Sequence, residues 1–137
     1  MAENRFVADI PHKAIVKNNG KVLIVQNSDS NLWEFPGGRL LDGEKSADRL
    51  KRSLQEKMNA YVEPLIIFET FPFVSLNGEK HFSVIYICKL MNDPESLSPN
   101  GSKIKDFKWI AEKDVDDYPM HLGYKNILKK YFESALD

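Results

Sequence analysis

A proline–glycine–glycine turn that leads into a single amphipathic helix is the feature that most restricts how this chain can fold. In "LWEFPGGRLLDGEKSADRLKRSLQEKMNA" the backbone cannot be helical across Pro36. From Ser46 onward, apolar residues recur at the spacing of one helix face. They are Ala47, Leu50, Leu54, Met58 and Tyr61. We therefore predict a helix that begins at Ser46, is capped by the Ser46 hydroxyl and is closed before Pro64.

Strand signals surround this helix on both sides. The stretch "HKAIVKNNGKVLIVQ" has two β-branched runs around Asn-Gly, which predicts a hairpin. Its second run lacks alternation, as expected of a strand buried on both faces. A second hairpin joins "LIIFETFPFVSL" to the alternating "HFSVIYICKLM", and "IKDFKWIA", "EKDVDDYPM" and "YKNILKKYFESAL" predict a strand, a helical turn and a final helix. This order predicts an α/β sandwich in which helices cover a mixed sheet.

Size and charge limit the classes of partner. A chain of 137 residues is long enough for one domain, residues 1–137, but too short for two. Its net charge of −1 gives no electrostatic case for nucleic acid or membrane binding. No stretch approaches the length of a membrane span and the N-terminus has no apolar signal core, so we expect a cytoplasmic protein. The pattern does not indicate an oligomeric state.

The single cysteine and the three histidines do not indicate a metal site. Cys88 is the only cysteine and falls in an apolar run, so we expect a packed, unreactive thiol. His12, His81 and His121 are scattered without metal-ligand spacing, and we expect them at the surface or at sheet edges. A set of aromatic residues could line a nucleobase pocket, although core packing is the simpler interpretation. They are Phe68, Phe71, Phe73 and Tyr86.

The polar flank of the helix carries the candidate site. At 100° per residue, four side chains share one sector beside the apolar stripe. They are Arg49, Ser53, Glu56 and Lys57. The glycines of "PGGRLLDGE" allow backbone amides to approach a ligand closely. Two simpler explanations stay open, namely a tight strand-to-helix connection and an exposed ladder of opposite charges at Asp48, Arg52 and Glu56.

The same stretch resembles the signature of the Nudix hydrolases, G-x5-E-x7-R-E-U-x-E-E-x-G-U, where U is a bulky aliphatic residue. Five positions match in register, and "WEFPGG" is the usual lead-in to that signature. The matches are Gly38, Glu44, Arg52, Leu54 and Glu56. The resemblance implies a Nudix-type α/β/α sandwich with a mixed β-sheet over nearly the whole chain.

The resemblance also implies an activity. Nudix enzymes cleave a diphosphate within nucleoside diphosphates linked to another group, using Mg²⁺ or Mn²⁺ held by helix glutamates. On that basis Gly37 and Gly38 would shape the loop, Glu44 and Arg52 would brace the loop against the helix, and Glu56 would be a metal ligand. "WIAEKDVDDYPM" is loosely similar to the base-binding end of MutT-like enzymes. The asparagine that they use would fall near Leu122, so we do not transfer their substrate.

The chain departs from the signature at two glutamate positions and at the glycine position. Ser53 and Lys57 stand where the signature has glutamate, and Asn59 stands where it has glycine. A lysine charge about 5 Å from a divalent ion is repelled by roughly 6 kcal/mol at an effective dielectric near 20. We therefore expect weakly held Mg²⁺ or Mn²⁺, at most one ion on Glu56, and slow hydrolysis. Glu34 and Asp42 are weak alternatives as substitute ligands.

The same substitutions also favour anion binding. Between residues 45 and 57 the chain has five Lys or Arg against two acids, which could bind phosphate oxygens without a full metal set. The predicted phosphate- or substrate-binding residues are Gly37, Gly38, Arg39, Arg49, Ser53 and Lys57. The leading hypothesis is a Nudix-like hydrolase, magnesium-dependent and weak, that cleaves a diphosphate bond in a nucleoside di- or triphosphate derivative. The alternative is a non-catalytic Nudix-fold module that binds a nucleotide or a protein partner.

Overall fold

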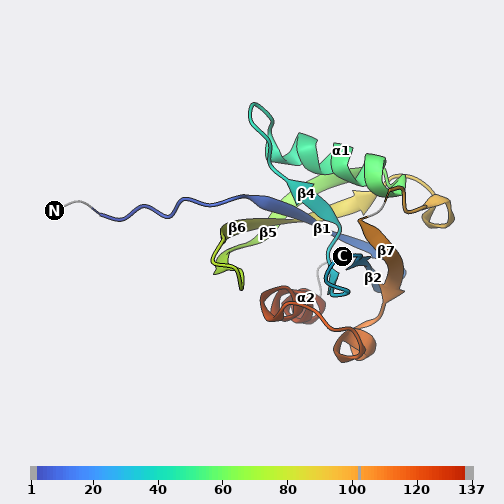
Figure 1. Cartoon of the computed structure of the whole chain (residues 1–137). Helices are drawn as coiled ribbons and strands as arrows, with labels where there is room; N and C mark the ends of the chain where they lie inside the picture. Colours follow the sequence, from blue (N-terminus) through green and yellow to red (C-terminus); the bar gives the residue numbers. More distant parts are fainter. Residues whose placement is uncertain (1–2, 102, 135–137) are drawn as a thin grey trace.

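The computed structural model describes residues 3–101 and 103–134, in which a mixed β-sheet lies between two helices. Figure 1 shows α1 (Ser46–Met58) on one face of the sheet and α2 (Leu122–Ser134) on the other. The strands are β1 (Pro11–Asn18), β2 (Lys21–Asn27), β3 (Trp33–Glu34), β4 (Gly37–Arg39), β5 (Val62–Val74), β6 (Lys80–Leu90) and β7 (Ile104–Ile110). Two 3-10 turns, η1 (Pro94–Ser96) and η2 (Glu112–Asp117), precede and follow β7. The predicted α/β sandwich is confirmed.

Strand β1 is the centre of the sheet. The order is β3-β2-β1-β6-β5, with β4 paired to β1 and β7 paired to β2. Only the β1–β6 pair is parallel among the described pairs of named strands; the others are antiparallel. The N-terminal part of β1 pairs with β4, from Pro11↔Arg39 to Lys13↔Gly37, while its C-terminal end pairs with β2. This branching positions β4 against α1.

Two hydrophobic cores, one on each face of the sheet, explain the apolar runs. Along β1, Ala14 and Val16 belong to the core under α1, while Ile15 belongs to the core under α2. Successive side chains of a strand point to opposite faces, so a strand covered on both sides needs apolar residues at every position. The prediction that the second run of the first hairpin is buried on both faces is confirmed, because β2 contributes to both cores.

Both Asn-Gly hairpins form where the sequence places them. Asn19 and Gly20 have φ of 51° and 77°, the left-handed conformation that a two-residue hairpin turn requires. Gly78, with φ of 84°, lies in the turn between β5 and β6. Strand β6 alternates as predicted, but both of its faces are covered. The more deeply buried face is the one opposite Phe82 and Val84, with His81, Ser83, Ile85 and Ile87.

The ends of α1 differ from the prediction. The helix begins at Ser46, but Lys45 is the N-cap and no side-chain cap bond forms there within the described residues. The prediction that the Ser46 hydroxyl caps the helix was therefore wrong. The helix ends when Asn59 adopts a left-handed conformation, so the apolar stripe stops at Met58. Tyr61 is exposed beyond it, and Pro64 lies inside β5 instead of closing the helix.

The histidine prediction was wrong for two residues. His12 is completely buried and His81 nearly so, because β1 and β6 are interior strands of the sheet. His121 is exposed just before α2, as expected. Cys88 is a buried free thiol, and its burial, with the nearby charge of Glu63, raises its pKa to about 12. Within the described residues, none of the helices has the length and apolar character needed to cross a membrane.

Candidate functional site

Three residues of α1, spaced four apart, face the three residues of β4 one by one. Arg49 Nε donates to the Arg39 carbonyl oxygen at 3.2 Å. Lys57 Nζ donates to the Gly37 carbonyl oxygen at 2.9 Å. Between them Ser53 lies against Gly38, so closely that a Cβ on Gly38 would come within 2.6 Å of Ser53 Oγ. Residues four apart lie on one side of a helix, and this row therefore runs along the strand.

The topology of β4 makes its carbonyl groups available to these cations. One edge of β4 pairs with β1, where the Pro36 carbonyl accepts from Ala14 N–H and the Leu40 N–H donates to Ile10. Carbonyls of successive residues point to opposite edges of a strand. The carbonyls of residues 37 and 39 therefore point to the other edge, where α1 supplies Lys57 and Arg49.

Unpaired polar atoms lie beneath Gly38. Ser53 is completely buried, and its Oγ has no hydrogen-bond partner among the described residues. The same holds for both ring nitrogens of His12, whose Nε2 would be 3.4 Å from a Cβ on Gly38. Burial lowers the pKa of His12 to about 4, and the charges of Arg49, Lys13 and Lys57 act in the same direction. The imidazole is therefore neutral at pH 7 and lies in a positive potential.

A buried ion pair completes this end of the site. Lys13 is 8% exposed, and its Nζ lies 3.5 Å from Glu34 Oε1 and 5.7 Å from the centre of the Tyr124 ring. Burial opposes the charged form, but Glu34 and Tyr124 outweigh it and raise the pKa of Lys13. For Lys57 the balance is opposite, because burial and then repulsion from Lys13 and Arg49 lower its pKa. Cations are therefore crowded around β4 without enough acids to balance them.

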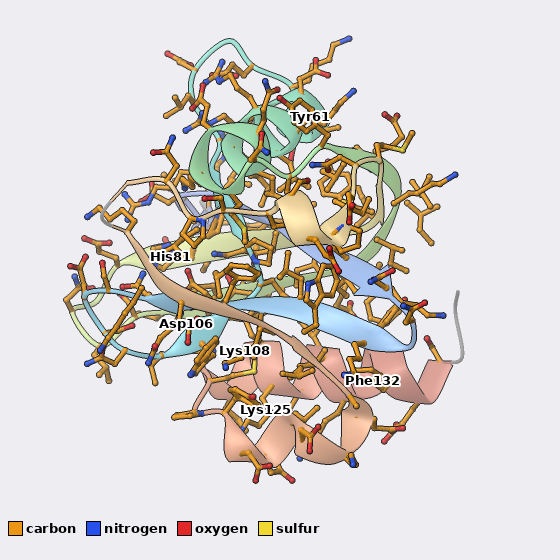
Figure 2. The ribbon with its side chains drawn as sticks, turned by 90° about the vertical axis from the view of Figure 1, so that its right-hand side faces the viewer. Tyr61, His81, Asp106, Lys108, Lys125 and Phe132 are labelled. Carbon is orange, nitrogen blue, oxygen red and sulfur yellow. The ribbon has the colours of Figure 1, made fainter. Side chains whose placement is uncertain are left out.

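The row on α1, strand β4 and the Lys13–Glu34 pair line a cavity of about 770 Å³, which is large enough for a nucleotide-sized ligand. Around β4 its wall is basic, with Lys13, Arg39, Arg49 and Lys57. Next to this basic wall lie aromatic rings from β5, β6 and α2. The Phe73 ring stacks on His81 at 4.8 Å between centroids and lies 5.1 Å from His121. Figure 2 shows His81 on the sheet between α1 and α2.

The predicted site residues divide into two groups. Gly37, Gly38, Arg39, Arg49, Ser53 and Lys57 all line the cavity. Glu56 is outside this group, with its side chain 62% exposed and Oε1 3.5 Å from Arg52 Nε. Arg52 also pairs with Glu44 at 2.9 Å, so the predicted brace between loop and helix is present as a contact. The catalytic roles of Glu44, Arg52 and Glu56 stay predictions.

The donor groups do not fit a divalent metal ion. In residues 3–101 and 103–134, no three His, Cys, Asp or Glu side chains are grouped so that they could hold one ion. Mg²⁺ and Mn²⁺ prefer several oxygen ligands. Glu56 is paired with Arg52, and Glu34 with Lys13. Asp42 is exposed in the loop before α1. The Gly37 carbonyl already accepts from Lys57.

Several site residues were not found from the sequence. The cavity wall also contains Lys13, Trp33, His81, His121 and Tyr124. One signal was available for Lys13, because a lysine inside the apolar run "HKAIV" needs a buried partner. Of the four aromatics considered, only Phe73 lines the cavity in the described structure; Phe68 and Phe71 pack against the core under α2, and Tyr86 against the other core.

Comparison with known proteins gives one family. The model of the NUDIX domain matches residues 13–131 of the chain. Among solved structures, a NUDIX hydrolase from Nitrosomonas europaea superposes with a TM-score of 0.81 at 14% identity, over 93% of this chain and 90% of that one. At this identity the superposition supports the fold, and the α/β/α sandwich with a mixed sheet is confirmed.

Two curated proteins are similar in sequence. Nudix hydrolase 5 of Arabidopsis thaliana is 24% identical over 115 residues, which is 78% of this chain but 37% of that protein. The uncharacterized Nudix hydrolase YvcI of Bacillus subtilis strain 168 is 25% identical over 116 residues, covering 83% of this chain and 73% of that protein. The chain thus spans little more than a third of the Arabidopsis protein and about three quarters of the bacterial one.

Proposed function

Because the chain belongs to the Nudix family, we propose that its cavity binds the diphosphate group of a nucleoside diphosphate derivative. The observation that carries this proposal is the row of Arg49, Ser53 and Lys57 along β4. It gathers two cations and an unpartnered buried hydroxyl on one cavity wall, with Lys13 beside them. Charged donors of this kind form short, strong hydrogen bonds to phosphate oxygens.

The second part of the cavity suits the rest of such a ligand. Phe73, His81, His121 and Tyr124 present stacked and edge-on rings beside the basic wall. A flat heterocycle or a sugar ring can pack on such rings, while the diphosphate lies on the cations. The partner is therefore a small nucleotide derivative and not nucleic acid or a membrane. A cytoplasmic location belongs to the same proposal.

Hydrolysis of the diphosphate is a second candidate function. Nudix hydrolases generally use divalent metal ions, and one observation favours retained chemistry here. Arg52 holds Glu44 at 2.9 Å, which is the brace between loop and helix that the signature implies, and Glu56 lies 3.5 Å from Arg52. The activity would be weak, because the described residues offer no set of three ligands for an ion and Glu56 is the one box glutamate left on the helix. It would also fall sharply on Glu56→Gln.

Calorimetry on the whole chain with a panel of nucleoside diphosphate sugars tests the proposal. We expect at least one to bind with a micromolar dissociation constant, and inorganic pyrophosphate to compete with it. Absence of binding across the panel would contradict the proposal. Phosphorus NMR of the same mixtures with Mg²⁺ or Mn²⁺ decides the second candidate. Cleavage above the buffer blank that disappears in Glu56→Gln would support hydrolysis, and no cleavage would leave binding alone.

A further inference from the structure

We propose that the cavity binds its diphosphate ligand without a divalent metal ion, with the Lys57 ammonium group in the place where such an ion would lie. The inference rests on the proposed function and adds the absence of a metal requirement to it. It starts from position 57, where the Nudix signature has glutamate and this chain has lysine. The Lys57 ammonium group donates to the Gly37 carbonyl oxygen at 2.9 Å.

The first support is the geometry of the ammonium group. A peptide carbonyl oxygen is a good ligand for a hard cation and an equally good acceptor for a lysine. Lys57 Nζ has three N–H donors, and the Gly37 carbonyl uses one of them. The side chain is half-buried and lines the cavity. Its remaining donors are therefore available to a ligand, at a position fixed by α1 and β4.

The second support is the charge balance of the cavity wall. Lys57 shares the cavity wall with Lys13, Arg39 and Arg49, so positive charge is crowded there in the folded chain. The nearest acids have partners of their own, because Glu34 pairs with Lys13 and Glu56 with Arg52. A bound dianion supplies the missing negative charge. A divalent cation at the same place would add to the repulsion instead.

The third support is the unpartnered hydroxyl. Buried polar atoms are nearly always hydrogen-bonded in folded proteins, and an exception calls for an explanation. Ser53 is one of the residues that line the cavity, and its buried Oγ has no partner within the described residues. Ser53 lies in the row between Arg49 and Lys57, so a phosphate oxygen held by those cations can accept a hydrogen bond from its hydroxyl. A metal ion would meet a neutral hydroxyl where the signature provides a carboxylate.

The inference predicts that added Mg²⁺ changes the affinity for the ligand in the direction opposite to that expected of a metal-dependent site. Free Mg²⁺ binds diphosphates and reduces their negative charge. A site that recognises the bare anion should therefore bind it more weakly when Mg²⁺ is added, whereas a site that needs the ion should bind it more tightly. EDTA should leave the binding of the metal-free anion unchanged.

The test is calorimetric titration of inorganic pyrophosphate and of ADP into the full chain, with EDTA and then with millimolar Mg²⁺. We expect binding in EDTA and a several-fold weaker affinity with Mg²⁺. Lys57→Met should weaken the affinity in EDTA about tenfold or more, since a charged hydrogen bond is lost. Lys51→Met is the matched control, because Lys51 is on the same helix, is exposed and pairs with Glu63 at 3.4 Å. It should bind as the wild type does.

Each outcome separates the inference from the proposed function. Binding seen only with Mg²⁺ would overturn the inference and leave the proposed function standing. No binding in either condition would remove both. Binding in EDTA that Lys57→Met leaves intact would overturn the role of Lys57. If Lys57→Met does not fold, Arg49→Gln provides the same test from the other end of the row.

NMR of the His12 ring gives an independent measurement. A bound anion beside Arg49, Lys13 and Lys57 should raise the pKa of His12 from about 4.

Discussion

Lys57 donates a hydrogen bond from Nζ to the Gly37 carbonyl oxygen at 2.9 Å, which ties the last turn of α1 to the first residue of β4. The contact joins residues 20 apart in the chain and closes one end of the basic wall. Arg49 makes the equivalent contact with Arg39 at the other end. The helix and the strand are thus held together by the same cations that face the cavity, so local packing and ligand binding depend on one row of side chains.

Gly38→Ala should destabilise the chain, and Ser53→Ala should partly restore the loss. The new Cβ would come within 2.6 Å of Ser53 Oγ, so we expect overpacking that costs about 1–3 kcal/mol in the free energy of unfolding. Removing the Oγ, which has no partner in the described structure, relieves that contact. Urea unfolding of both single variants and the double variant measures the coupling. Simple additivity would contradict the prediction.

Gly37→Ala is the control for this cycle. Its Cβ would lie 2.0 Å from the His12 carbonyl oxygen, which belongs to the backbone of β1 and cannot rotate away. We expect a larger loss of stability than for Gly38→Ala, and no rescue by Ser53→Ala. A similar rescue at both positions would mean that the strand, and not Ser53, accommodates the added methyl group.

Folding stability should fall on mild acidification because of His12. Its pKa in the folded chain is lowered from 6.5 to about 4, mainly by burial, so the unfolded chain takes up a proton first as the pH falls. The contribution of neutral His12 is therefore complete above about pH 6.5 and is lost between there and pH 4. Between pH 7 and pH 5 we expect a loss of about 2 kcal/mol in the free energy of unfolding.

His12→Gln isolates this effect, since glutamine is similar in size and does not titrate. Urea unfolding at pH 7 and pH 5 should show a much smaller pH dependence in the variant. Both proteins share the remaining titratable groups near His12, which are Lys13 on β1, Arg49 and Lys57 on α1, and Glu44 in the preceding loop. The same slope in both proteins would show that another group controls the acid response.

Local sequence patterns predicted the two hairpins, α1, β7 and α2, but not the short strands β3 and β4. Hydrophobic period and Asn-Gly turns located both hairpins and α1, and the helical sector correctly grouped Arg49, Ser53 and Lys57. Glu56 shares that sector on a helical wheel, yet its side chain lies with Arg52, one turn earlier. A wheel gives the direction in which a residue leaves the helix, but a long side chain follows its nearest opposite charge.

The remaining part of the site depends on topology that local pattern does not contain. His12 lies beneath Gly38 and Lys13 lines the cavity because β1 is the central strand, paired in parallel with β6 and at its start with β4. Parallel pairing joins segments about 70 residues apart, so no short window reveals it. The Lys13–Glu34 pair likewise joins β1 to β3, which lies beyond β2 in the sheet, so no short window reveals it.

Asn59 should tolerate glycine better than alanine. It has φ of 56° in the left-handed region, and its backbone N–H bonds the Gln55 carbonyl at the end of α1. The signature has glycine here, and asparagine is the usual non-glycine residue in this conformation. We expect Asn59→Ala to cost about 1 kcal/mol in the free energy of unfolding and Asn59→Gly to change it by less than about 0.5 kcal/mol. If glycine is the worse substitution, the bond from Asn59 Nδ2 to the Ser96 carbonyl dominates instead.

Lys57→Glu should reverse the effect of divalent ions on pyrophosphate binding. The change removes the ammonium group from the Gly37 carbonyl and places a carboxylate at the position where the signature has one. A hard ion can then share that carboxylate, the Gly37 carbonyl and the phosphate oxygens, so binding should require Mn²⁺ or Mg²⁺ and vanish in EDTA. Calorimetry in both conditions measures the reversal.

Lys51→Glu makes the same charge change on an exposed part of α1 and should leave the wild-type behaviour intact. Tight binding to Lys57→Glu in EDTA would show that position 57 does not control the metal requirement.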